Sequence, residues 1–297
     1  MKRIMLFLLT NIAIMVVLSI TLRLLGVDSI LAENGSDLNI QALVILSGVI
    51  GFGGSIISLL ISKWMAKRMT GAVVITNPTT NIEKWLMNTV EKQAEIVGIK
   101  MPEVAIFPTS AMNAFATGAT KNNALMAVSQ GLLDNMNQGE IEAVVGHEMS
   151  HIANGDMVTM ALIQGVVNTF VVFFSRIIGH IVDRVILKNN QGHGIGYFVT
   201  VMIAQVILSI LASTIVMYFS RQREFVADTG GADLAGHQNM ISALKRLGQV
   251  EPEALPEQMA AFGINDKNGF MALFSSHPPI EDRIEALEKR AMNMARS

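Results

Sequence analysis

The residues best suited to chemistry are His147, Glu148 and His151, which form an H-E-x-x-H motif. On a helix, residues four positions apart lie on one face, so both imidazoles can bind a single metal ion. A carboxylate beside such an ion can act as a general base toward water. The chain has no cysteine, so histidine and carboxylate side chains must hold any metal. The motif therefore predicts a metal site that supports hydrolysis, with Glu148 as the base.

Local signals predict a helix around this motif. Asn137, followed three residues later by Glu140, matches a capping box, and Asn154-Gly155 can end the helix in a left-handed turn. The polar residues around the motif indicate an aqueous setting, which argues against a zinc transporter that carries H-E-x-x-H inside a membrane helix. The intact Glu148 argues against a third alternative, a scaffold that has lost catalysis.

A catalytic zinc ion needs a third protein ligand besides the two histidines. The candidates are acidic residues and one histidine: Glu140, Glu142, Asp156, Glu224, Asp228 and His277. Asp156 follows too closely after the predicted helix end, and Glu140 and Glu142 lie a turn or more before His147. Glu224 and Asp228 are four residues apart on a predicted helix, so one can bind the metal while the other orients a ligating imidazole. The alternative is an ordinary solvated helix.

The composition indicates contact with lipid. Hydrophobic residues make up 51% of the 297 residues and charged residues only 15%, against roughly a quarter in soluble domains. The formal net charge is -2, so no basic field points to nucleic acid. No phosphate-binding glycine motif is present in the sequence, so we expect no nucleotide partner.

Four apolar segments predict membrane helices: Ile4–Leu22, Ile40–Ser62, Met157–Ser175 and Ile195–Ser220. The first is longer than the core of a signal peptide, so we predict a retained helix rather than a cleaved signal. The last two would form a hairpin. Because Gln164 and Asn168 are unfavourable in lipid, its first arm either inserts fully, as we expect, or lies partly buried in protein.

Basic residues near the ends of these segments predict the orientation. The expected inner flanks carry Lys2, Arg3, Lys63, Lys67, Arg68, Arg221 and Arg223, and the expected outer loops carry Arg23, Arg184, Lys188 and, in one alternative, Arg176. Both termini would therefore face the cytoplasm. A hairpin starts and ends on one side of the membrane, so the segments before and after it share a compartment and can build one site.

The overall expectation is an α+β protein, mainly helical, with four hydrophobic helices and a cytoplasmic catalytic domain. Short strands are predicted at Val104–Phe107, Asn113–Thr117 and Ala124–Val128, and together they suggest a small antiparallel sheet. The predicted division is 1–63 for two N-terminal membrane helices, 64–156 for a catalytic segment, 157–220 for a membrane hairpin and 221–297 for a second catalytic segment.

The segment that begins with Asn113, Ala114 and Phe115 is a candidate for substrate binding. It combines small residues with one aromatic side chain, and we expect it to form a sheet edge above the motif helix. An edge strand can pair with an extended peptide through its backbone, whatever the peptide's side chains. The alternative is an internal strand whose Phe115 is a core residue.

A hydrolytic site also needs a donor for the developing oxyanion. His277 is the best candidate because Pro278 and Pro279 stiffen its loop, although it could instead cap the helix that begins near Ile280. Arg283 could assist, or could pair with a glutamate on its own helix, Glu281 or Glu285. The remaining histidines are expected to be structural: His180, His193 and His237.

These motifs together resemble the HtpX family of integral membrane zinc metalloproteases, which are related to the CAAX prenyl proteases. The resemblance covers nearly the whole chain and includes the segments Ala111–Gly118, His147–Asp156, Glu224–Asp228, Ser276–Pro279 and Arg283-Ile284. It implies a zincin-like domain that binds one Zn²⁺ through His147, His151 and Glu224. It also implies Glu148 as catalytic base and Asp228 as the partner of a ligating histidine, expected to be His147.

The resemblance further implies a function and a place. It implies an endopeptidase of the bacterial inner membrane, with its active site facing the cytoplasm. Its partners would be the lipid bilayer and protein substrates, chiefly damaged or misassembled membrane proteins, in a stress response that serves protein quality control.

Overall fold

The computed structural model describes residues 39–189, 192–249 and 275–294. The predicted first membrane segment, Ile4–Leu22, and both termini lie outside these residues. The chain divides into two compact units. Of the described residues, one unit takes in 39–57 together with those between Ala161 and Val216, and the other takes in Ser58–Met160 and those from Met217 onward. The first is built from the apolar segments, and the second contains the H-E-x-x-H motif.

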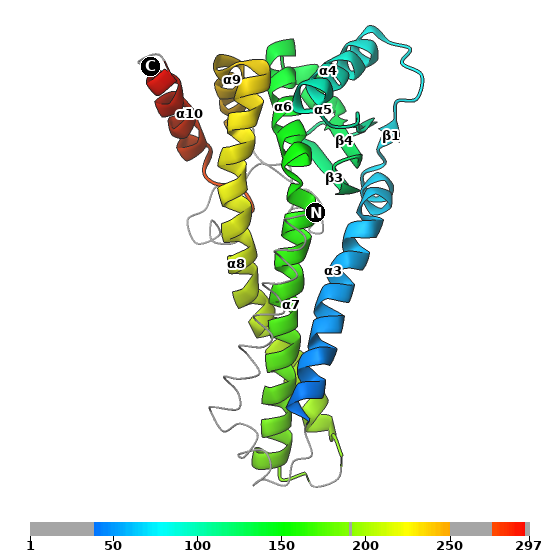
Figure 1. The fold of residues 1–297 in the computed structure, drawn as a ribbon, viewed down its shortest axis with the longest axis vertical. Helices are drawn as coiled ribbons and strands as arrows, with labels where there is room; N and C mark the ends of the chain where they lie inside the picture. Colours follow the sequence, from blue (N-terminus) through cyan, green and yellow to red (C-terminus); the bar gives the residue numbers. More distant parts are fainter. Residues whose placement is uncertain (1–38, 190–191, 250–274, 295–297) are drawn as a thin grey trace. The chain divides into compact units, whose positions relative to one another are not determined.

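Within the described residues, three helices are long and apolar enough to cross a membrane (Figure 1). They are α3 (Ile40–Thr70), α7 (Asp156–Ile181) and α8 (Ile195–Ala235), and α7 continues into a π-helical turn η1 (Val182–Ile186). They cover three of the four predicted apolar segments. α8 continues well past the predicted apolar run, and this extension carries Glu224 and Asp228 on a helix, as expected.

Small residues let these helices pack closely inside the first unit. A Cβ atom at Gly51 of α3 would lie 2.4 Å from Thr169 Oγ1 of α7, and one at Gly179 of α7 would lie 2.4 Å from a Val201 methyl of α8. Such approaches replace the hydrophobic effect, which is weak between helices in lipid. The amide of Gln164 donates a hydrogen bond to Asn168 Oδ1 at 2.8 Å, so the two polar side chains of α7 partly satisfy each other.

The second unit contains a four-stranded sheet in the order β1-β2-β4-β3. Its strands are β1 (Val73–Val74), β2 (Glu103–Phe107), β3 (Ala114–Thr120) and β4 (Asn123–Ser129). β2 and β4 run parallel, whereas the other two pairs are antiparallel. The prediction of an antiparallel sheet is therefore wrong, and the sheet is mixed. The reason is that β4 forms a local hairpin with β3 and then lies between β3 and β2, which brings it parallel to β2.

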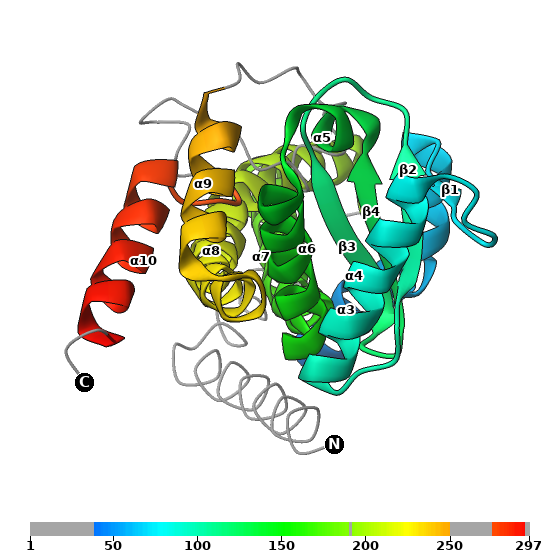
Figure 2. The same ribbon diagram turned by 90° about the horizontal axis from the view of Figure 1, so that it is seen from above.

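Helices cover the sheet and form the main core. They are α4 (Asn81–Val97), α5 (Gln130–Asn135), α6 (Gln138–Asn154), α9 (His237–Gly248) and α10 (Ile280–Met294). Viewed from above, α4 and α6 lie beside the strands (Figure 2). Leu86, Met126 and Ile141 are buried where α4, the sheet and α6 meet. A smaller cluster on the other face contains Phe107 and Phe115.

The motif helix α6 has the predicted ends. Asn137 and Glu140 form a capping box, and Gly155 ends the helix with a φ of 68°. The C-terminal part of α8 packs directly on α6, because a Cβ atom at Gly230 would lie 2.3 Å from Ser150 Oγ. This close approach brings the acidic residues of α8 up to the histidines of α6.

Candidate metal centre

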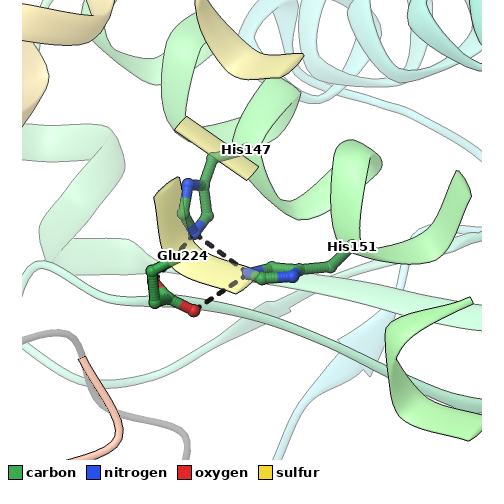
Figure 3. A group of neighbouring side chains, drawn as sticks. All are labelled: His147, His151 and Glu224. Atoms are coloured by element: carbon green, nitrogen blue, oxygen red, sulfur yellow. Dashed lines mark hydrogen bonds and ion pairs between the residues drawn. The ribbon is translucent and has the colours of Figure 1, made fainter. Parts of the chain in front are cut away.

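Three side chains from two helices converge on one point. His147 and His151 come from α6 and Glu224 from α8, and each points a donor atom at the same space (Figure 3). The two Nε2 atoms are 3.1 Å apart, and the carboxylate oxygens of Glu224 lie 3.4 Å from His147 Nε2 and 3.2 Å from His151 Nε2. Ligands about 2.0 to 2.1 Å from a tetrahedral zinc ion lie about 3.3 to 3.4 Å from one another. The observed separations are close to the edges of such a site.

The hydrogen bonds at the far side of each ring explain why this arrangement suits a cation. His147 Nδ1 bonds Asp228 Oδ1 at 2.9 Å, and His151 Nδ1 bonds Asp156 Oδ2 at 2.7 Å. A carboxylate accepts the Nδ1 proton, so each Nε2 presents a lone pair when the ring is neutral. Two lone pairs and the carboxylate of Glu224 then face one another in a buried space. This donor set fits a divalent metal ion bound by histidine and carboxylate.

The His147 side of the centre is almost fully buried. Arg283 donates two hydrogen bonds to Asp228, through Nε at 2.7 Å and Nη2 at 2.6 Å. Burial alone would lower the pKa of Arg283, but the charge of Asp228 outweighs it and raises this pKa above its ordinary value. Burial would also lower the pKa of His147, yet its bonds to Asp228 and Glu224 raise it overall. Both shifts indicate that the centre stabilises positive charge.

Arg283 was expected to assist catalysis or to pair with Glu281 or Glu285. The structure instead places its guanidinium on Asp228 of α8, and 3.6 Å from Glu224. The pairing within its own helix is therefore wrong. The reason is that Arg283 lies on the buried face of α10, with a side chain only 1% exposed, whereas Glu281 and Glu285 are exposed on that helix.

Sequence reasoning missed the role of Asp156, which was considered only as a metal ligand. Asp156 is the first residue of α7, directly after the left-handed turn at Gly155. This turn brings its carboxylate back to His151, and Arg223 of α8 forms an ion pair with the same carboxylate. The signal that could have found it is the Gly-Asp sequence directly after the motif helix, since a chain reversal there returns the acidic side chain toward the motif.

His277 lies beside the third ligand. Its Nδ1 is 2.6 Å from Glu224 Oε2, so the ring reaches the centre from the loop before α10. Its other nitrogen, Nε2, is buried and has no hydrogen-bond partner among the described residues. Because a carboxylate only accepts, Nδ1 donates this bond to Glu224. Nε2 then offers a donor when both ring nitrogens are protonated, and in the neutral ring it carries a lone pair.

The remaining acidic candidates have distinct places. Glu148 is buried on α6 next to His147 and outside the group of three donors. Glu140 closes the capping box and accepts a 2.7 Å hydrogen bond from Ser242 of α9, so it serves the helix start. Glu142 uses its backbone carbonyl to accept a bond from Gln93. Neither of these two belongs to the centre.

The candidate substrate strand lies at the sheet edge next to α6. The strand order leaves β1 and β3 at the two edges of the sheet that the structure describes. The carbonyl of Asn113 accepts a 2.8 Å bond from the Ser129 N–H, and residues along an antiparallel ladder alternate in direction. The backbones of Phe115 and Thr117 therefore face β4, whereas those of Ala114 and Ala116 face outward.

The side chain of Phe115 belongs to the core. It is 3% exposed, and its ring centroid lies 5.4 Å from that of Phe107. The side chain of Phe115 is thus a core residue, as the alternative expectation held, although the strand itself is at an edge of the sheet and not internal. Since its backbone also faces β4, Phe115 offers no group to an added strand. The outward backbone groups of Ala114 and Ala116, on either side of it, are placed to pair with an added strand.

A helix that carries H-E-x-x-H, a glutamate from a second helix and a small mixed sheet together define a metallopeptidase. The profile of Peptidase family M48 matches residues 81–291, and the chain belongs to this family.

The relatives extend this assignment over almost the whole chain. A protein named Protease HtpX homolog from Nitrosomonas europaea is 61% identical over 290 residues, which is 97% of this chain and 99% of the relative. Protease HtpX from Nitrosococcus oceani is 60% identical over 289 residues, 96% of this chain and 98% of the relative. The resemblance to the HtpX family is confirmed, and the three apolar helices agree with a bacterial membrane protein.

A solved structure shares the fold. The crystal structure of S. mikatae Ste24p aligns with a TM-score of 0.59 over 95% of this chain and 66% of that chain, at 16% sequence identity. At this identity the likeness concerns the fold alone.

Proposed function

We propose that the protein is a zinc-dependent endopeptidase with Glu148 as its general base. The observation that carries this proposal is the convergence of His147 Nε2, His151 Nε2 and the Glu224 carboxylate, with both Nδ1 atoms held by other carboxylates. This donor set suits zinc better than calcium or magnesium, which prefer oxygen ligands only. Zinc, when bound, would supply a Lewis acid that activates water and polarises the scissile carbonyl.

Glu148 and His277 divide the remaining chemistry. Glu148 is buried and adjacent to a metal ligand, so its carboxylate can take a proton from the attacking water and pass it to the leaving amine. His277 donates through Nδ1 to Glu224, and with both ring nitrogens protonated its Nε2–H would donate to the carbonyl oxygen as negative charge develops there.

The edge strand β3 would hold the substrate. Its outward groups belong to Ala114 and Ala116, and an extended peptide could pair with them as a further antiparallel or parallel strand. Asn113, whose buried Oδ1 has no hydrogen-bond partner among the described residues, directly precedes this strand. Recognition through backbone groups would allow many different sequences to be cleaved.

The proposed substrates are damaged or misassembled membrane proteins, cleaved on the cytoplasmic side of the inner membrane. The resemblance to HtpX proteases supports the substrate class, and the bias of basic residues supports the orientation. Reporter fusions after Lys67 and at Ser297 should both report the cytoplasm, and a fusion at Asn34 the opposite side. A Ser297 fusion that reports the outside would overturn the orientation.

The decisive experiment measures cleavage of an unfolded test protein, such as casein, by the detergent-purified full chain. Wild type should cleave it and contain one equivalent of zinc by elemental analysis. A chelator should stop cleavage, and added zinc should restore it. Glu142→Gln is the matched control, because Glu142 lies on the same helix and outside the centre. Cleavage that continues at full rate without metal would overturn the proposal.

A further inference from the structure

Both histidines of the centre are backed by an aspartate, and each aspartate is in turn held by an arginine. On one side the order is His147, Asp228, Arg283, and on the other it is His151, Asp156, Arg223. The first set is nearly inaccessible, whereas the second is slightly open, with side-chain exposures of 13% for Asp156 and 15% for Arg223. In the second set, Asp156 and Arg223 both lie outside the H-E-x-x-H motif.

We propose that Asp156, held by Arg223, is a positioning residue that fixes the ring of His151 for metal binding. This inference rests on the proposed metal site. Its basis is geometric: Asp156 Oδ2 lies 2.7 Å from His151 Nδ1, and its other oxygen, Oδ1, pairs with the Arg223 guanidinium. A carboxylate that uses its two oxygens on two different partners has little freedom to turn.

The chain reversal at Gly155 makes this contact possible. Gly155 has a φ of 68°, a conformation that favours glycine, and it separates the end of α6 from the start of α7. Asp156 would point away from the motif if the helix simply continued past Asn154. Its position as the first residue of α7 also places its charge at a helix N-terminus, where a carboxylate is stabilised.

Two neighbouring residues of α8 act on the two nitrogens of His151. Glu224 Oε1 lies 3.2 Å from Nε2, while Arg223 holds the carboxylate that bonds Nδ1. The orientation of this ring therefore depends on α8 at both ends. The bond from Nδ1–H to a carboxylate also fixes the tautomer that leaves Nε2 free for a metal and increases its basicity.

The test is metal affinity, measured by chelator competition on the purified full chain with Zn²⁺ and with Co²⁺. Asp156→Asn keeps the shape and an acceptor but removes the charge, and should weaken binding about 10- to 100-fold, as is typical when the partner of a ligating histidine is lost. The visible absorption of bound Co²⁺ should change as well, since it reports ligand geometry. Unchanged affinity and an unchanged Co²⁺ spectrum would overturn the inference.

Arg223 should act only through Asp156. Arg223→Gln should weaken metal binding less than Asp156→Asn, and the double variant should bind no more weakly than Asp156→Asn alone. Additive losses would contradict the proposed order of contacts. If Asp156→Asn does not fold, judged by gel filtration and melting without metal, Arg223→Gln alone must weaken binding for the inference to stand.

Asp233 provides a matched control on the same helix. It forms an ion pair with Arg290 of α10 at 2.9 Å, and it belongs to no part of the centre. Asp233→Asn should therefore leave metal affinity and the Co²⁺ spectrum unchanged. Failure of wild type and Asp233→Asn to bind metal would instead refute the metal site itself, which separates the two outcomes.

Discussion

The two sides of the proposed active site differ in whether they rely on side chains or on backbone groups. The metal side depends on side chains: three candidate ligands come from α6 and α8, and behind each imidazole lies an aspartate that is held by an arginine. The strand side depends on backbone: β3 presents outward groups from two alanines, while the side chain of Phe115 packs into the core. A metal requires fixed geometry within tenths of an ångström, whereas a protease of broad specificity gains by ignoring side chains.

The largest effects are expected from variants that separate metal binding from catalysis. Glu224→Ala should lose bound metal, as His147→Ala does, because only two ligands remain. Glu148→Gln should keep the metal and lose cleavage by about 100- to 10,000-fold, because only the base is removed. Elemental analysis and casein cleavage on the same preparations measure both. Release of the metal by Glu148→Gln would show that these roles are wrongly assigned.

A smaller effect is expected one contact away from the metal. Asp228→Ala should weaken metal binding by about 10- to 100-fold, less than Glu224→Ala does, because His147 remains a ligand but loses its orientation. It also leaves the buried charge of Arg283 with only its longer 3.6 Å contact to Glu224, so the melting temperature without metal should fall. Chelator competition and thermal melting measure the two effects, and an affinity equal to wild type would contradict the first.

The strand side can be tested by comparing two proline variants. Ala116→Pro removes an outward N–H and should lower peptide cleavage about fivefold, equivalent to the loss of one backbone hydrogen bond of about 1 kcal/mol, with metal content unchanged. Thr117→Pro removes an N–H that faces β4 and should destabilise the fold instead. Full activity of a folded Ala116→Pro protein would remove the support for backbone recognition.

The smallest effect on activity is expected at Phe115. Phe115→Leu keeps an apolar residue in the cluster with Phe107, so cleavage should stay within about twofold of wild type while unfolding becomes easier by about 1 kcal/mol. Steady-state cleavage and denaturant unfolding of the purified full chain measure these changes. A large loss of activity without loss of stability would mean that the side chain contacts substrate after all.

The sequence by itself determined the features that depend on short spacing. The motif helix, its capping box and its left-handed end all follow from residues within a few positions of one another, and helical periodicity puts His147 and His151 on one face. The apolar segments predicted α3, α7 and α8, because length and hydrophobicity alone are enough to indicate a membrane-spanning helix. The spacing narrowed the candidates for the third ligand to Glu224 and Asp228. The resemblance to a family then implied Glu224 as the ligand and Asp228 as the partner of a histidine.

Only the tertiary structure decided the contacts between distant charges and the pairing of strands. Arg283 binds Asp228 rather than a glutamate on its own helix because α10 turns this residue toward α8, which no local pattern specifies. Asp156 meets His151 and Arg223 because a chain reversal and the packing of α8 bring three elements together. Likewise β4 lies between β2 and β3, so the sheet is mixed, because strand order is set by how the hairpin packs against the rest of the core rather than by propensity.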